Sequence, residues 1–203
     1  MEFFELHPEN PQIRFINKAV DVLRSGGLII FPTDTYYGLG CDIFNKEGIE
    51  QILMIKNETD TKLFSFICSD LKDIAKYAKV SDYAYKTMKH LLPGPYTFIL
   101  PAAKVVPKKL WSKRKTVGIR VPNHEVTLQI VKELGNPIVS TSTTTRKGEP
   151  LVNSMEIKSI FNSQVDLMLA SNNMSFEPSS VIDLSSDTPE IIREGVGDVS
   201  MFK

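Results

Sequence analysis

Short apolar runs alternate with amphipathic segments along the chain, and this alternation predicts strands joined by helices. Residues 11–25 carry apolar side chains at helical spacing and end at Ser-Gly-Gly, which predicts an amphipathic helix closed by a glycine. The apolar run at 27–31, GLIIF, predicts a buried strand. The same reasoning predicts further helices at 46–56, 70–78, 81–92, 123–135 and 154–161. It predicts further strands at 62–68, 96–100, 116–121, 137–142, 165–169, 180–184 and 190–194, with a short lysine-rich helical piece around Trp111.

This order of elements predicts an α/β fold. Strands mixed with crossover helices favour a domain built around a largely parallel or mixed twisted sheet. A chain of 203 residues can bury a sizeable core, and it contains no repeat, no low-complexity linker and no obvious boundary. We therefore expect one domain over residues 1–203.

Composition argues against several classes of protein. Lys+Arg and Asp+Glu both count 24, so any affinity for nucleic acid must come from a local basic patch. Cys41 and Cys68 cannot form a disulfide scaffold, and no CxxC pair or Cys/His cluster indicates a structural zinc site. No stretch approaches the roughly 20 apolar residues of a membrane span. We expect a cytoplasmic protein with two buried cysteines, no structural metal and no membrane partner.

Polar residues follow four of the predicted strands or apolar runs. They are PTDTYYGLG at 32–40, RVP at 120–122, STSTTTRKG at 140–148 and PSSVID at 178–183. In an open α/β sheet, ligands bind beyond the carboxyl ends of strands, so these segments are candidate site residues. Each one taken alone is also explained by turn chemistry, because Thr, Ser, Asp and Gly satisfy backbone groups at strand ends.

The first of these segments is the least turn-like. Its two glycines permit close backbone approach, while its threonines and tyrosines could enclose a small polar ligand the size of an amino acid. Further on, Lys56 and Lys62 flank Glu58, and two lysines could converge on a triphosphate. A solvated charged loop is the alternative for that stretch.

The hydroxyl-rich segment at 140–148 matches no standard nucleotide motif. It has neither GxxxxGK[ST] nor GxGxxG spacing, and Ser140 and Ser142 would share one side of a strand. A serine nucleophile is not expected, because the three histidines show no triad order and no GxSxG elbow is present.

A basic stretch without acidic residues runs from Lys104 to Arg120. Such clustering lets a neutral protein present a phosphate-binding face, and Trp111 could stack on a base or anchor the local helix. A solvated helix face is the alternative. The candidate RNA-binding residues are Lys104, Lys108, Lys109, Lys113, Arg114 and Lys115.

Taken together and in this order, the motifs resemble the YrdC/YciO family, whose characterised enzymes are threonylcarbamoyl-AMP synthases. The resemblance covers nearly the whole chain and rests on GGLIIFPTDTYYGLG, LLPGPYTFIL, KRKTVGIRVP, NPIVSTS, SSVIDL and IIREG. It implies a single YrdC-like domain with a core of about 13–197, a twisted mixed sheet and a basic concave cavity. The family's enzymes convert ATP, L-threonine and bicarbonate to threonylcarbamoyl-AMP and pyrophosphate for tRNA modification, and members bind tRNA or double-stranded RNA.

Carried over position by position, the resemblance implies roles for individual residues. The implied threonine-binding residues are Thr35, Tyr37, Arg120, Ser140 and Ser179. The implied nucleotide-binding residues are Lys56, Lys62, Thr116, Ser142 and Arg193. No side chain is expected to act as a covalent catalyst, because Mg²⁺ bound to ATP, charge neutralisation and alignment would suffice.

The chain also departs from the synthase pattern. Glu58 stands where the synthases usually carry a phosphate-facing arginine, and Thr144 stands where they carry an asparagine. The residues of the segments RKTVGIRVP and EGVGDV are more similar to those of the YciO-type branch. These departures favour a weak or conditional synthase that also binds RNA. The alternatives are a non-catalytic RNA-binding paralogue with a residual nucleotide cavity, and a small-molecule-binding α/β protein unrelated to RNA.

Overall fold

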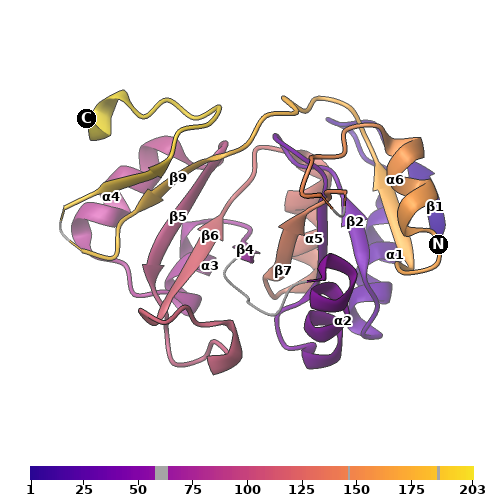
Figure 1. Cartoon of the computed structure of the whole chain (residues 1–203), viewed down its shortest axis with the longest axis horizontal. Coiled ribbons are helices and arrows are strands. Elements are labelled where there is room, and N and C mark those ends of the chain that lie inside the picture. Colours follow the sequence, from indigo (N-terminus) through magenta and orange to yellow (C-terminus); the bar gives the residue numbers. More distant parts are fainter. Residues whose placement is uncertain (58–63, 146, 187) are drawn as a thin grey trace.

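The strands of the chain form one continuous mixed sheet whose outermost strands lie near the two ends of the chain (Figure 1). The computed structural model describes residues 1–57, 64–145, 147–186 and 188–203. Across these residues the strand order is β1-β8-β2-β3-β7-β4-β6-β5-β9-β10. The strands are β1 (Glu2–Glu5), β2 (Ile29–Phe31), β3 (Gly38–Asp42), β4 (Ser65–Ile67), β5 (Tyr96–Pro101), β6 (Thr116–Arg120), β7 (Ile138–Ser142), β8 (Leu167–Ala170), β9 (Ser180–Asp183) and β10 (Glu190–Arg193).

The helices fall where the apolar spacing predicts them. They are α1 (Ile13–Arg24), α2 (Lys46–Lys56), α3 (Leu71–Tyr77), α4 (Asp82–Leu91), α5 (Glu125–Leu134) and α6 (Ser154–Phe161), with short 3₁₀ turns η2 (Lys108–Leu110) and η3 (Ser200–Phe202). The predicted glycine stop after α1 is confirmed, because Gly26 has a φ of 85°. Asn45 caps α2 by accepting the Gly48 N–H at 2.9 Å. The predicted lysine-rich helical piece is η2, which ends directly before Trp111.

The prediction of a single α/β domain with a mixed sheet is confirmed, but two strands were missed. β1 is a short edge strand with a glutamate at each end, and it pairs only with β8 in the described residues. β3 contains two glycines and an aspartate, residue types that are depleted in strands. It is stabilised from both sides, because it pairs antiparallel with β2 and with β7. The segment that opens as a polar loop after Phe31 therefore continues as a strand at Gly38.

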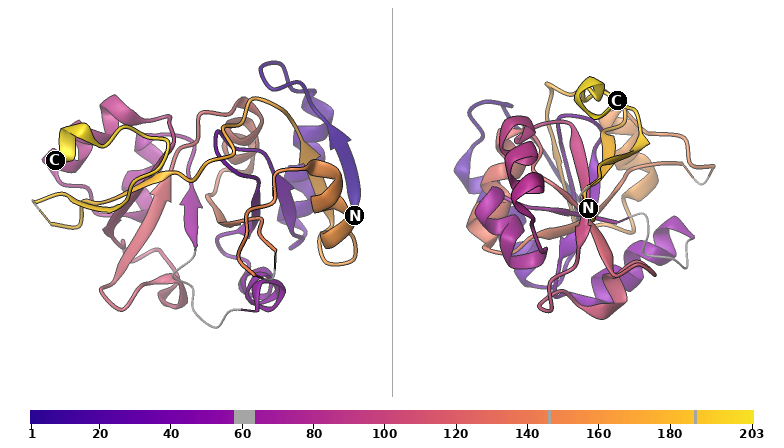
Figure 2. Two further views of the ribbon diagram at one scale, coloured as in Figure 1. Left: turned by 45° about the horizontal axis from the view of Figure 1, so that its top comes forward. Right: turned by 90° about the vertical axis from the view of Figure 1, so that its left-hand side faces the viewer.

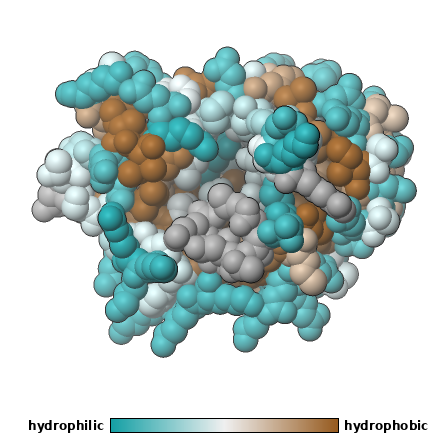
Figure 3. All heavy atoms as spheres, in the orientation of Figure 1, coloured by the Kyte–Doolittle hydropathy of each residue, from teal (hydrophilic) through white to brown (hydrophobic). Residues whose placement is uncertain are grey.

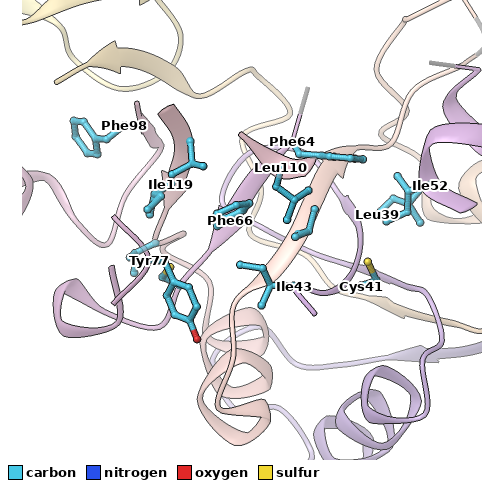
Figure 4. Close-up of a cluster of buried hydrophobic side chains, with 14 of the residues drawn as sticks. Leu39, Cys41, Ile43, Ile52, Phe64, Phe66, Tyr77, Phe98, Leu110 and Ile119 are labelled. Atoms are coloured by element: carbon cyan, nitrogen blue, oxygen red, sulfur yellow. The ribbon is translucent and has the colours of Figure 1, made fainter. Parts of the chain in front are cut away.

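Strand alternation divides the core between the two faces of the sheet. In β2, Ile29 and Phe31 join the cluster formed with α1 and α5, whereas Ile30 joins the larger cluster on the opposite face. The larger cluster runs from Phe98 to Ile52 (Figure 4) and links the two halves of the chain. Figure 2 shows α3 and α4 (magenta) to one side of the strands, with the β9–β10 hairpin (yellow) near the C-terminus.

Cys41 and Cys68 are buried free thiols, as predicted. Burial raises the pKa of the Cys41 thiol to about 12. Neither sulfur is therefore a thiolate at neutral pH, and both pack as small apolar side chains. No helix among the described residues is long and apolar enough to cross a membrane.

Candidate functional site

A cavity of about 850 Å³ lies against the middle strands of the sheet. Its lining comes from both halves of the chain, from the loop before β3 through β7, β4, β6 and β5 to the start of β9. The face drawn in Figure 3 is hollowed near its centre. The charged side chains among its described lining residues are Lys56, Arg120 and Arg193. The cavity is therefore present where the motifs converge, and its basic character as a whole stays a prediction.

The fold brings most of the predicted site residues to this one cavity. Those that line it are Tyr37, Lys56, Thr116, Arg120, Ser140, Ser142, Ser179 and Arg193. Thr35 is buried and is not among the described lining residues. Its hydroxyl lies 3.2 Å from the hydroxyl of Thr33, which does line the cavity. Glu58 and Lys62 lie outside the described residues.

The hydroxyl of Thr33 makes several hydrogen bonds that hold the loop between β2 and β3. Its hydroxyl donates to the Tyr36 carbonyl at 2.6 Å and accepts from the Thr35 N–H at 3.1 Å. It also accepts from Nη2 of Arg120 at 3.4 Å. The family resemblance implied a threonine-binding role for Thr35, and that role stays a prediction. The structure assigns the cavity-lining position to Thr33.

Arg120, at the end of β6, is a buried cation held by one carboxylate. It is 8% exposed, and its Nη2 forms an ion pair with Oδ1 of Asp34. The other carboxylate oxygen of Asp34 accepts the Asn123 N–H at 3.0 Å. Burial lowers the pKa of Arg120, and the Asp34 charge opposes that shift. Among the described residues, Nε of Arg120 is a buried donor without a hydrogen-bond partner.

Arg193, on β10, binds Ser179, the residue directly before β9, through two nitrogen atoms of its guanidinium. Its Nε and Nη2 donate to the Ser179 carbonyl at 3.0 and 2.9 Å, and Nη2 also donates to the Ser179 hydroxyl at 3.2 Å. That hydroxyl lies 3.0 Å from the Thr97 hydroxyl. Burial is the main cause that lowers the pKa of Arg120, and the Arg193 charge adds a smaller effect in the same direction. Both guanidinium groups line the cavity, and two cations in one cavity are a favourable setting for an anion.

The centre of the cavity floor is built from small residues on adjacent strands. Ser140 pairs with Ser65, and Ser65 pairs with Gly118, so these three cross β7, β4 and β6 in register. Gly38 lies on β3 beside them, and a Cβ there would be 2.7 Å from Cζ of Phe31 and 2.8 Å from Oγ of Ser140. Only glycine fits at position 38, whereas a Cβ at Gly118 would make ordinary contacts, the nearest at 3.4 Å to Cγ2 of Thr97.

Two further predicted residues are engaged with neighbours. The Thr116 hydroxyl lies 2.7 Å from the Ser112 hydroxyl, which also accepts the Thr116 N–H at 3.0 Å. The Tyr37 hydroxyl donates to the Ser171 carbonyl at 2.9 Å, and burial raises the pKa of Tyr37. Tyr37 therefore lines the cavity while its hydroxyl holds the segment after β8.

His124 lies behind the Arg120–Asp34 pair and was not among the predicted site residues. Its Nε2 lies 3.0 Å from the Asn172 carbonyl, and its Nδ1 is buried without a partner among the described residues. Burial lowers the pKa of His124, an effect opposed by the hydrogen bond to Asn172 and by Asp34. The ring is therefore neutral at neutral pH, with Nε2 as the donor.

All six candidate RNA-binding residues are exposed and lie on the loop that joins β5 to β6, at the bottom of Figure 1. One of them has a carboxylate neighbour that the sequence did not predict. Nζ of Lys109 lies 2.5 Å from Oε1 of Glu50 on α2, and this ion pair is itself exposed. Lys109 is therefore less available to a phosphate than the other five.

The described residues form no carboxylate cluster of the kind that holds a resident metal ion. No group of three or more His, Cys, Asp or Glu side chains within the described ranges could hold a metal ion. The described lining of the cavity contains no carboxylate.

Comparisons with known proteins agree with the fold. A model of the Sua5/YciO/YrdC family, described as telomere recombination, matches residues 21–195. YciO of Escherichia coli K12 is 43% identical over 203 residues, which cover 99% of this chain and 98% of that protein. The crystal structure of E. coli YciO superposes with a TM-score of 0.94 over 100% of both chains.

Two more distant relatives are named for an activity or a ligand. A threonylcarbamoyl-AMP synthase of Coxiella burnetii is 34% identical over 156 residues, covering 76% of this chain and 83% of the synthase. The crystal structure of P. abyssi Sua5 complexed with L-threonine has a TM-score of 0.88 at 25% identity, covering 96% of this chain and 58% of that one.

Proposed function

The chain belongs to the Sua5/YciO/YrdC family, and from this premise we propose that its cavity binds ATP and L-threonine. The proposed activity is that of an L-threonylcarbamoyladenylate synthase-like nucleotidyltransferase, weak or conditional, in a protein that also binds RNA. The observation that carries the proposal is Arg120, a buried guanidinium that lines the cavity and donates to the Thr33 hydroxyl. A ligand carboxylate suits this group, because a guanidinium fork matches carboxylate geometry.

The proposed chemistry requires positioning more than covalent catalysis. Bicarbonate carbon joins the threonine nitrogen with loss of water, and the resulting carbamate oxygen attacks the α-phosphorus while the bond to pyrophosphate breaks. Lys56 and Arg193 would neutralise phosphate charge, and the Ser140–Ser65–Gly118 floor would let the reacting groups lie close to the sheet. Because the described lining carries no carboxylate, Mg²⁺ would enter with the ATP phosphates.

Turnover is tested directly with the purified chain, MgATP, L-threonine and ¹⁴C-bicarbonate. We expect slow formation of a labelled adenylate together with an equal amount of pyrophosphate, and no product when threonine is left out. Pyrophosphate release that does not depend on threonine would contradict the assignment of threonine as substrate. A complete absence of labelled product above background would remove the synthase proposal and leave the non-catalytic RNA-binding paralogue.

RNA binding is proposed for the exposed basic loop between β5 and β6. Replacing Lys108, Lys113, Arg114 and Lys115 by alanine is expected to weaken tRNA binding. It should also flatten the slope of log K against log salt by about 3 if each residue neutralises one phosphate. The measurement is a fluorescence titration with tRNA at several salt concentrations.

A matched variant controls for net charge in that titration. Lys72, Lys79, Lys86 and Lys89 are exposed on and around α3 and α4, and their replacement by alanine removes the same charge elsewhere. The control variant should keep most of the slope of log K against log salt. Equal loss in both variants would show non-specific attraction, and a titration that is flat with salt would favour a small-molecule-binding protein unrelated to RNA.

A further inference from the structure

Lys56, the last residue of α2, reaches the end of β7. Its ammonium donates to the Ser142 carbonyl at 3.2 Å and to the hydroxyl of Thr144. Both acceptors are neutral oxygen atoms, and these two contacts hold the ammonium at the end of β7. Lys56 and Thr144 both line the cavity.

We propose that Thr144 is the positioning residue for Lys56, and that its hydroxyl holds the ammonium where the polyphosphate of a nucleotide binds. The inference rests on the proposed binding of ATP and adds a function for a residue at which the chain departs from the synthase pattern. It assigns to Thr144 an action through Lys56, and no contact with the reacting atoms.

Positioning matters for this lysine because its stem is flexible. A lysine side chain loses much of its rotamer freedom when it is ordered, and this loss opposes binding. A lysine that is already held by Ser142 and Thr144 has lost part of this freedom before the ligand arrives. Pre-organisation of this kind increases affinity for the group that the charge faces, here a chain of phosphates.

The backbone around Thr144 is ordered independently of its side chain. Thr144 forms an antiparallel bridge with Pro150, and the next residue, Thr145, donates its N–H to the Glu149 carbonyl at 2.8 Å. Loss of the Thr144 hydroxyl therefore removes an acceptor from Lys56 and leaves the hairpin in place. This separation makes the residue testable.

The test compares MgATP with AMP by calorimetry on the full chain. Thr144→Val keeps the side-chain shape and removes the acceptor, and we expect MgATP to bind about ten-fold more weakly while AMP affinity changes little. Thr144→Ser restores an acceptor hydroxyl and should restore the MgATP affinity. Thr188→Val, an exposed threonine on the loop before β10, is the matched control and should bind like the unchanged chain.

Three outcomes would contradict the inference, and one of them would also contradict the proposed function. If Thr144→Val weakens MgATP and AMP equally, the residue acts on the general shape of the site and the positioning inference is wrong. If MgATP affinity is unchanged in Thr144→Val while the unchanged chain binds it, only the inference falls. If the unchanged chain binds neither nucleotide, the proposed function falls and the inference falls with it.

Discussion

Replacement of Arg120 by methionine is expected to lower the free energy of unfolding by about 3 kcal/mol and to abolish saturable binding of L-threonine. The loss of stability follows from Asp34, whose side chain is only 12% exposed and would keep a single described partner, the Asn123 N–H. Leaving one member of a buried ion pair without the other is costlier than removing both. The loss of binding follows from the proposed contact between the guanidinium and the ligand carboxylate.

Urea unfolding and calorimetry with L-threonine separate these two effects. The double variant Asp34→Asn, Arg120→Met should recover much of the stability, because no buried charge is left, and should still fail to bind threonine. Arg14→Met, at an exposed position on α1, is the matched control and should cost no more than about 1 kcal/mol, the value of its exposed contact with the Phe15 ring. A double variant no more stable than Arg120→Met would show that the ion pair is not the source of the loss.

The sequence predicts the helices and the buried strands because their apolar spacing is strong. α1, α5 and β2 are examples, each recognisable from a repeated apolar position and a glycine boundary. β1 and β3 could not be predicted in the same way, because their stability comes from pairing with strands distant in sequence. The apolar spacing and the composition of such a segment do not show which strands it pairs with.

Eight of the residues that line the cavity were predicted as site residues, but their partners were not predictable. Ser140 and Ser142 line the cavity from one strand, and Thr141 between them does so too, so strand alternation alone does not select the lining residues. The pairing of Arg120 with Asp34 joins residues 86 apart in sequence, and the sequence gives no sign of it. The presence of Thr33 rather than Thr35 in the described lining could not be predicted either, since a loop's direction depends on what it packs against.

These partners hold the cations of the cavity in place. Arg120 is held by a carboxylate, Arg193 by the Ser179 carbonyl and Lys56 by the end of β7. Each anchor comes from a different part of the sheet, so the three charges are fixed by the fold as a whole. Long cationic side chains ordered in this way would lose little further entropy when an anion binds.

Replacement of Gly38 by alanine is expected to destabilise the protein by about 2 kcal/mol. The added Cβ would lie 2.7 Å from Cζ of Phe31, and the Phe31 ring is fully buried in the cluster with α1 and α5. The ring has no space to retreat, so β3 must shift against β2 or the ring must leave its rotamer. Urea unfolding measures the loss, and ligand binding should be lost with it.

Gly118→Ala gives the contrasting result at a neighbouring place in the same floor. Its Cβ would meet no described atom closer than 3.4 Å, so we expect stability to change by less than about 1 kcal/mol. The methyl group would nevertheless occupy floor space in the cavity, and MgATP binding should weaken several-fold in calorimetry. If Gly118→Ala binds MgATP as the unchanged chain does, the nucleotide does not lie over β6. If Gly38→Ala is as stable as the unchanged chain, β3 and Phe31 are less tightly packed than their contacts indicate.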